Sequence, residues 1–448
     1  MKNILSSYWI KSGLINIIQR FSGTVFGFLN FALLARHLTK EEFGIWAIFM
    51  VIVTIYELSK NGLLKSAHIR FVTSSNDEKT KKEVAWSSLS LNFITALLFI
   101  LFIAIFSKSL STWLNAGVEL SRILKLFIPG IIIMVFYSHY EAVQQSYLDF
   151  KSLFYGNIVR QSSFFFAILY YHQTNTTVTL NTVLLFHTIS ILLGAITLFL
   201  TGYKYLTFKI EPSIIWIKKI INYGKFIFGS NIISNLYSNL DQLMTSKFLS
   251  PIVVSYYSTA SKISGIIDIP INAAADVLFP KMAQASSDEN SKKVKYFLEK
   301  AIALLLCFII PATIFITIFS KLIVEIIAGP MYSEASFIVQ IYVIRMTIGI
   351  FQHQSANALI SIGKSKLHFL LNSIGFVLKI TITYICLKYF GFYGAAIGSI
   401  IMPTINFIIW YFVMKKQINV NLKNILNYII IFYQDILGKT YKTVTNKN

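Results

Sequence analysis

Charged residues are scarce in this chain. Only 13% of its 448 residues are Asp, Glu, Lys or Arg, whereas about a quarter of an ordinary soluble domain is charged. Hydrophobic residues make up 55% of the chain, and the mean hydropathy is +0.64. This composition excludes a soluble domain, and we predict an all-α integral membrane protein.

Acidic residues are the scarcer of the two charged kinds, with 19 Asp and Glu against 40 Lys and Arg, which gives a formal net charge of +21. In a soluble protein such an excess would suggest binding to nucleic acid. In a membrane protein it is typical of cytoplasmic loops that are rich in Lys and Arg. We therefore expect contact with membrane lipids and none with nucleic acid.

Cysteines and catalytic motifs are also few. The two cysteines, Cys307 and Cys386, each lie in an apolar segment, where a thiol behaves as a small hydrophobe. The sequence contains no phosphate-binding G-x-x-x-x-G-K-S/T loop, no H-E-x-x-H, no C-x-x-C and no G-x-S-x-G. We therefore expect no enzymatic activity, no cofactor and no metal.

Long apolar windows are abundant. A membrane core of about 30 Å requires about 20 apolar residues of helix. Four windows contain no charged residue, namely 85–105, 183–201, 301–319 and 391–414. Eight more are as long but contain polar or charged residues, namely 13–35, 43–63, 126–148, 153–171, 226–245, 253–279, 335–362 and 367–387. The sequence thus predicts twelve transmembrane helices.

The connections between these windows alternate in charge. One set is rich in Lys and Arg and includes Lys60, Lys65, Arg70, Lys204 and Lys281, whereas the segment 172–180 in the other set has no Lys, Arg, Asp or Glu. Short cytoplasmic loops are the ones enriched in Lys and Arg. We therefore expect both termini in the cytoplasm.

The chain also shows an internal repeat. Gly13 has a counterpart at Gly224, and His37-Leu38-Thr39 has one at Phe248-Leu249-Ser250 with the same spacing. Two six-helix halves that start on the same side would be parallel repeats. We therefore predict two pseudo-symmetric six-helix lobes around a central cavity. The expected organisation is a first lobe at 1–202, a cytoplasmic linker at 203–225, a second lobe at 226–414, and a basic cytoplasmic tail with a short interfacial helix at 415–448.

Five cations are predicted to lie near the middle of the membrane, in five different helices: Arg20, Arg160, Lys262, Arg345 and Lys379. Each ionisable residue at that depth costs about 2.5 kcal/mol or more, so it normally faces a bundle interior or a water-filled cavity. Each could instead pair with a carboxylate or extend toward the interface. Mid-depth carboxylates are too few to pair with all five.

Polar residues recur every three or four positions in the window 226–245, and such spacing places them on one helix face. They are Asn231, Ser234, Asn235, Ser238, Asp241 and Gln242. The alternative is a hydrogen-bonded contact between helices. A further candidate is His353, whose imidazole can form hydrogen bonds with sugar hydroxyls. The carboxylates Asp241, Asp268 and Glu141 could bind a coupling ion.

A cluster of fixed positive charge within the membrane is suited to moving an anionic group across it. We interpret the five cations, with Asn235 and His353, as candidate ligands of a lipid-linked pyrophosphate and its glycan, with charge-assisted hydrogen bonds to the phosphates. Movement of one lobe against the other would give alternating access.

Several segments also resemble a known family. They are Gly13, Arg20 and Gly27, then Leu38-Thr39-Lys40-Glu41-Glu42-Phe43-Gly44, then Gly62 and Ala67-His68-Ile69-Arg70, and in the second half Asp241-Gln242-Leu243 and Pro280-Lys281-Met282. They are similar to bacterial polysaccharide exporters of the multidrug, oligosaccharidyl-lipid and polysaccharide flippase superfamily. The resemblance implies a fold like that of the multidrug exporters. It also implies an O-antigen-type flippase that moves undecaprenyl-pyrophosphate-linked oligosaccharide to the outer leaflet, beside the polysaccharide polymerase and the chain-length machinery.

Two other functions fit parts of the sequence. An ion-coupled multidrug exporter of the same superfamily would use carboxylates such as Asp241, Asp268 and Glu141. A membrane-embedded polysaccharide polymerase would need a large external loop with catalytic residues, and the predicted external loops are short. The excess of mid-depth cations favours an anionic substrate.

Overall fold

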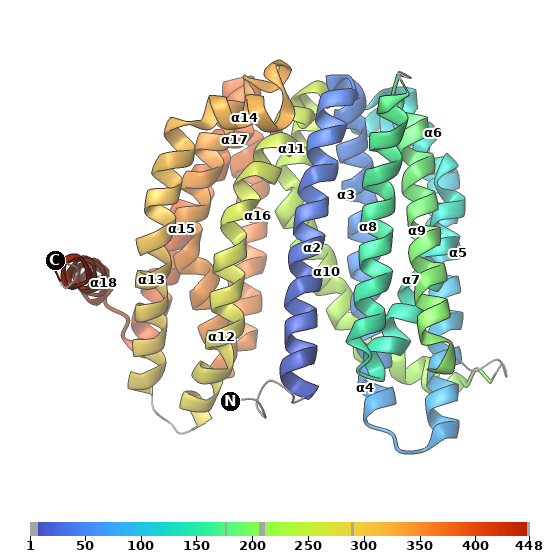
Figure 1. Cartoon of the computed structure of the whole chain (residues 1–448), viewed down its shortest axis with the longest axis horizontal. Helices are drawn as coiled ribbons and strands as arrows, with labels where there is room; N and C mark the ends of the chain where they lie inside the picture. The colour runs from blue at the N-terminus through green and yellow to red at the C-terminus, as the bar shows by residue number, and fades with distance from the viewer. Residues whose placement is uncertain (1–7, 175–176, 206–210, 288–290, 446–448) are drawn as a thin grey trace. The chain divides into compact units, whose positions relative to one another are not determined.

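The chain is all-α in the part that the computed structural model describes, which is residues 8–174, 177–205, 211–287 and 291–445 (Figure 1). The α-helices are α2 (Tyr8–His37), α3 (Lys40–Leu63), α4 (Lys65–Thr73), α5 (Glu78–Trp113), α6 (Gly117–Leu126), α7 (Ile128–Ser146), α8 (Phe150–Gln173), α9 (Leu180–Gly202), α10 (Ile214–Phe248), α11 (Pro251–Ser264), α12 (Asp268–Ser287), α13 (Ser291–Ile318), α14 (Ser320–Ala328), α15 (Ala335–Ser361), α16 (Ser365–Phe390), α17 (Gly394–Ile418) and α18 (Leu422–Thr445). Short 3₁₀ turns η1 (Tyr203–Tyr205), η2 (Gly265–Ile267), η3 (Pro330–Tyr332) and η4 (Gly391–Tyr393) join some of them.

Helices long enough to span a bilayer lie on all twelve of the predicted windows. Within the described residues, seven helical segments are long and apolar enough to cross a membrane, and α6 with α7 forms an eighth that is bent by 48°. One of the seven, Ser365–Ile418, contains both α16 and α17. The polar-rich helices α2, α8 and α10 have 30, 24 and 35 residues, so they too exceed the length of a bilayer core. The all-α, multi-pass membrane fold is confirmed.

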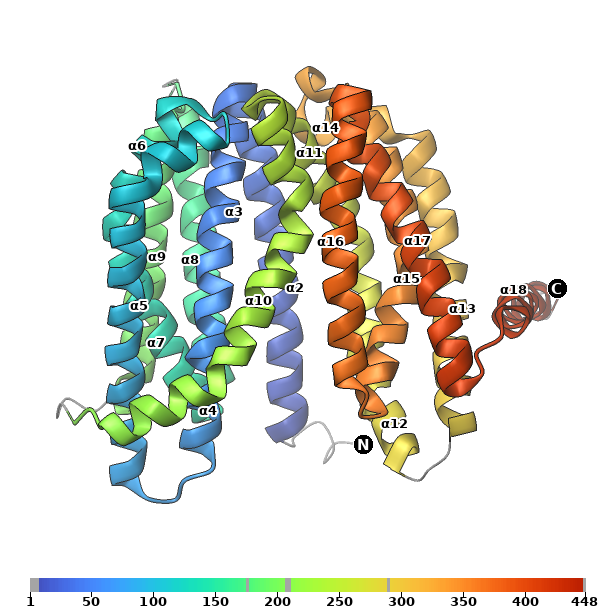
Figure 2. The same ribbon diagram turned by 180° about the vertical axis from the view of Figure 1, so that it is seen from behind.

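The chain divides into two compact units, Met1–Ser255 and Tyr256–Asn448. The first unit therefore includes α10, which the sequence analysis assigned to the second lobe. The reason is packing within the first unit: α10 crosses α3 along its length and also contacts α4 and α5 (Figure 2). The boundary between the lobes at 202/226 was derived from the repeat in the sequence and stays a prediction. In the structure, α10 packs within the first unit.

Glycines allow α3, α10 and the start of α11 to approach closely. A Cβ atom added at Gly224 would overlap the backbone of Leu63, and one at Gly62 would overlap the side-chain amide of Asn231. At the other end of α3, a Cβ at Gly44 would overlap the carbonyl of Pro251. Backbone-to-backbone contact at small residues is a general way for membrane helices to associate.

Replacing Gly224 by Ala is expected to destabilise the first unit. The added methyl meets the Leu63 backbone, which cannot rotate away, so the cost should be about 1–3 kcal/mol, the usual range for overpacking. Gly229 lies on the same helix with open space around it, so Gly229→Ala is the matched control and should be neutral or slightly stabilising. The measurement is the thermal unfolding midpoint in detergent, and equal midpoints for the two variants would contradict this account of the contact.

Two irregularities in the first unit shape its polar interior. The chain bends between α6 and α7 at Phe127, where Pro129 lies in the first turn of α7. Proline is tolerated in the first turn of a helix, so α7 can begin directly after the bend. A second break, which the sequence analysis did not predict, falls after Leu63: α3 ends, and the separate helix α4 packs against α7.

In the second unit, proline does not always interrupt a helix. Pro311 lies inside α13 and Pro403 inside α17, and both helices continue past them. The last helix, α18, packs against α13 and runs across the direction of the spanning helices of its unit (Figure 1). Its Tyr433 Oη donates a hydrogen bond to the carbonyl of Cys307, at 2.8 Å. This orientation is the one expected of an interfacial helix.

Candidate functional site

An ion pair lies in the interior of the first unit, between α3 and α8. Arg160 Nη1 is 3.8 Å from Glu57 Oε1, and the two side chains are 20% and 23% exposed. The guanidinium also lies over the ring of Tyr137 on α7, 4.7 Å from its centroid. Tyr137 in turn donates to Asn157 Oδ1, at 3.0 Å. Pairing with a carboxylate was the alternative left open for each cation, and Arg160 has such a partner in Glu57. Its role in binding a substrate stays a prediction.

Lys60 lies deeper in the same unit and is only 1% exposed. Its Nζ donates to Ser138 Oγ at 3.1 Å, and Asn92 on α5 donates to the same oxygen at 3.0 Å. The sequence analysis counted Lys60 as a loop residue, which is wrong because α3 extends through Leu63. The i, i+3 spacing of Glu57 and Lys60 on α3 is the signal that would have placed both on one helix face.

A second ion pair joins α4 to α7. Lys65 Nζ is 2.9 Å from Glu141 Oε2, with both side chains mostly covered. Next to it, the rings of His68 and His139 meet edge to face, with centroids 5.8 Å apart. Glu141 was a candidate for ion coupling, and that role stays a prediction. In this structure its carboxylate is engaged by Lys65.

The second unit has its own cluster of ionisable groups, on α12 and α15. Asp268 lies at the start of α12, which packs against α15, and α15 contains Arg345 and His353 about two turns apart. The Arg345 guanidinium is half-buried over the ring of Tyr342, 4.2 Å from its centroid. His353 is exposed. The structure thus places three of the candidate residues, including the possible ion ligand Asp268, on two helices that pack together.

Two further cations of the second unit lie on separate helices. Lys379 on α16 is 4% exposed, whereas Lys262 on α11 is exposed. An exposed ammonium within a spanning helix requires water or an anionic partner. Arg20 lies on α2, but its side chain is outside the described residues. The assignment of these cations to a substrate site stays a prediction.

The polar stripe on α10 divides into two parts. Asn231 Nδ2 donates to the carbonyl of Leu58 at 2.9 Å, so this residue joins α10 to α3, as the hydrogen-bonding alternative proposed. Asn235 is half-buried and donates to the carbonyl of Asn231 on its own helix, at 2.7 Å. Asp241 is buried, whereas Ser234 and Ser238 are exposed. The exposed serines show that part of the stripe is not covered by the first unit.

These arrangements have a common chemical property. Some cations within the spanning helices contact a carboxylate or an aromatic ring, and Arg160 contacts both, Glu57 and Tyr137. A pair that is partly open to solvent is held weakly, so a phosphate can compete with the carboxylate for the cation. Such a site suits binding and release of an anion.

Comparisons with known proteins identify the family of the chain. The family model described as "Polysaccharide biosynthesis protein" matches residues 33–337. The "Putative O-antigen transporter" of Shigella flexneri is 22% identical, and the match covers 87% of this chain and 93% of that protein.

Two solved structures share the fold. "Lipid II flippase MurJ, inward closed conformation" has a TM-score of 0.76 at 15% identity and covers 93% of this chain and 90% of its own. "Inward-facing conformation of a multidrug resistance MATE family transporter of the MOP superfamily" has a TM-score of 0.77 at 14% identity, covering 88% of this chain and 94% of its own. The expected exporter-like fold is thus confirmed. The family match spans more than half of the sequence, and the chain belongs to the family described as "Polysaccharide biosynthesis protein".

Proposed function

We propose that this protein translocates an undecaprenyl-pyrophosphate-linked oligosaccharide from the cytoplasmic to the outer leaflet of the bacterial inner membrane, with both termini in the cytoplasm. The observation that carries the proposal is the set of cations within the spanning helices α8, α11, α15 and α16. A lipid-linked pyrophosphate is the anion that a membrane protein of a polysaccharide family would meet at that depth. The names of the Shigella flexneri relative and of the lipid II flippase support the same substrate class.

In the proposed mechanism, the phosphates replace carboxylates as partners of the cations. Arg160 would leave Glu57 as the headgroup arrives, since charge-assisted hydrogen bonds to phosphate are stronger than a partly solvated ion pair. Arg345 would add a further cation from α15. Lys262 and Lys379 add positive charge from α11 and α16, and Asn235 and His353 offer hydrogen bonds to the glycan. The lipid tail stays in the bilayer while access alternates between the two leaflets, and the polysaccharide polymerase and chain-length machinery act on the product.

Deletion of the gene tests the proposal. We expect the lipid-linked oligosaccharide to accumulate on the inner leaflet and surface polysaccharide to be lost, while sensitivity to cationic drugs is unchanged. The measurements are lectin labelling of intact cells, mass analysis of the extracted lipid fraction, and growth inhibition by a panel of drugs. Normal surface polysaccharide in the deletion strain would refute the proposal.

A multidrug exporter is the second candidate, because the fold is shared with a multidrug resistance transporter. It would use Asp241, Asp268 or Glu141 to bind a cation. One of these carboxylates, Glu141, is already engaged by Lys65, which weakens that assignment. Increased drug sensitivity with normal surface glycan after deletion would establish it.

A further inference from the structure

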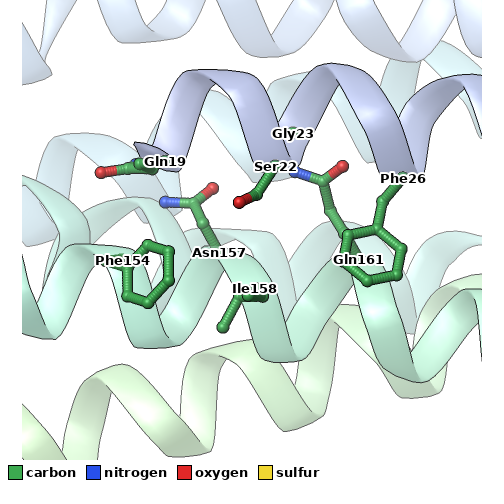
Figure 3. Close-up of a pocket in the computed structure, with 8 residues that line it drawn as sticks. All are labelled: Gln19, Ser22, Gly23, Phe26, Phe154, Asn157, Ile158 and Gln161. Atoms are coloured by element: carbon green, nitrogen blue, oxygen red, sulfur yellow. The ribbon is translucent and has the colours of Figure 1, made fainter. Parts of the chain in front are cut away.

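A groove lies between α2 and α8 in the first unit (Figure 3). From α2 it receives Gln19, Ser22 and Phe26, and from α8 it receives Phe154, Asn157 and Gln161. On each helix these residues recur every three to four positions, so they share a face that looks toward the other helix. The empty volume is about 170 Å³.

A neighbouring face of α2 is apolar, so the polar groups are concentrated on the side toward α8. Ile18, Phe21, Val25 and Leu29 are all exposed, as expected where a helix meets lipid. The amides and the hydroxyl lie on the face toward α8, beside this apolar face. Polar groups at this depth need a polar partner, because hydrocarbon cannot hydrogen-bond them.

Hydrogen bonding between the helices does not account for these amides. Gln19 Oε1 is buried and accepts no hydrogen bond within the described part of the chain. Asn157 is held in place by Tyr137, which donates to its Oδ1, and its own Nδ2 donates to Leu153 within α8. One amide N–H of Asn157 is left over after these hydrogen bonds, and Figure 3 shows the Asn157 amide between α8 and α2. The groove therefore presents donors and acceptors that the protein does not use up.

We infer that this groove is a subsite for a neutral sugar ring of the lipid-linked glycan. A side-chain amide offers an acceptor and two donors, so it can bind two adjacent hydroxyls of a pyranose at once. Phe26 and Phe154 supply flat apolar surfaces for the C–H face of the ring, as in other small-molecule sites where a few polar groups fix orientation. The inference rests on the proposed function.

The groove also lies next to the candidate phosphate ligand of the first unit. Asn157 and Gln161 flank Arg160 on α8, and Tyr137 contacts both Asn157 and Arg160. A headgroup phosphate on Arg160 would therefore leave an attached sugar close to the amides. As the side chains stand, no water-sized space is free in the groove, so the sugar enters by rotation of the two flexible glutamines.

The test compares two ligands on the full-length protein in lipid nanodiscs. One is undecaprenyl pyrophosphate without sugar, and the other is the glycan-bearing lipid extracted from the deletion strain. We expect the wild-type protein to bind the glycan-bearing lipid about tenfold more tightly, equivalent to about one or two added hydrogen bonds. The double variant Gln19→Leu/Gln161→Leu should lose this difference and keep its affinity for undecaprenyl pyrophosphate.

The control is Gln173→Leu, which removes an exposed amide at the end of the same helix and should keep the tenfold difference. The subsite is refuted if the double variant keeps the difference, or if the wild-type protein shows none while binding undecaprenyl pyrophosphate. Failure of the wild-type protein to bind either lipid would instead refute the proposed function itself.

Discussion

Replacing Arg345 by Ala is expected to lower export of the lipid-linked glycan by about 10- to 100-fold while the protein still inserts into the membrane. Arg345 is half-buried on α15 with its guanidinium over the ring of Tyr342, so its charged group is positioned to bind a phosphate. Loss of one or two charge-assisted hydrogen bonds costs about 1.5–3 kcal/mol, which corresponds to this range. The measurement is surface polysaccharide per copy of inserted protein in the deletion strain.

Two further variants make this result specific. Arg345→Lys keeps the charge but loses the bidentate geometry, so it should retain part of the activity. Arg122 is the matched control: it pairs with Glu119 on the exposed side of α6, at 3.1 Å, and Arg122→Ala should export normally. Normal export by Arg345→Ala would show that this cation takes no part in transport.

The second large effect is expected at the ion pair of Glu57 and Arg160. Glu57→Gln leaves the guanidinium without its carboxylate in the interior of the first unit, whereas the double variant Glu57→Gln/Arg160→Gln removes both charges. Breaking a fully buried pair costs about 3–5 kcal/mol, and the partial exposure of this pair reduces the expected cost to about 1–2 kcal/mol. We therefore expect the double variant to be more stable than the sum of the two single effects predicts.

A double-mutant cycle of unfolding free energies in detergent measures this coupling. The second ion pair, between Lys65 and Glu141, provides an independent comparison within the same unit. Strictly additive effects for Glu57 and Arg160 would contradict the interaction between them.

The fold could be predicted largely from sequence, because spanning helices carry a strong and local signal. The windows of about 20 apolar residues coincide with helices, and Pro129 marks the bend before α7. The break after Leu63 was missed because no Pro or Gly-Pro motif marks it, and α4 is a separate helix through its packing on α7. The position of α10 in the first unit likewise depends on close contact at Gly62 and Gly224, which hydropathy does not report.

The candidate site was predictable only in its residue types. Depth along a helix identified Arg160 and Arg345 as intramembrane cations, but their neighbours lie far away in the sequence. The Glu57 partner of Arg160 comes from α3, and Asp268 lies on α12, which packs against the helix of Arg345. Lys60 was predicted to lie in a loop because a charged residue near a helix end is usually in the following connection. In the structure it lies within the bundle, where Ser138 on α7 accepts its hydrogen bond.

Transbilayer movement in proteoliposomes tests the central claim most directly. Purified protein would be reconstituted with the glycan-bearing lipid extracted from the deletion strain, and the fraction that becomes accessible to an external lectin would be followed over time. We predict rapid movement with the wild-type protein, slow movement with Arg345→Ala and normal movement with Arg122→Ala. Equal rates in liposomes with and without the wild-type protein would contradict the account.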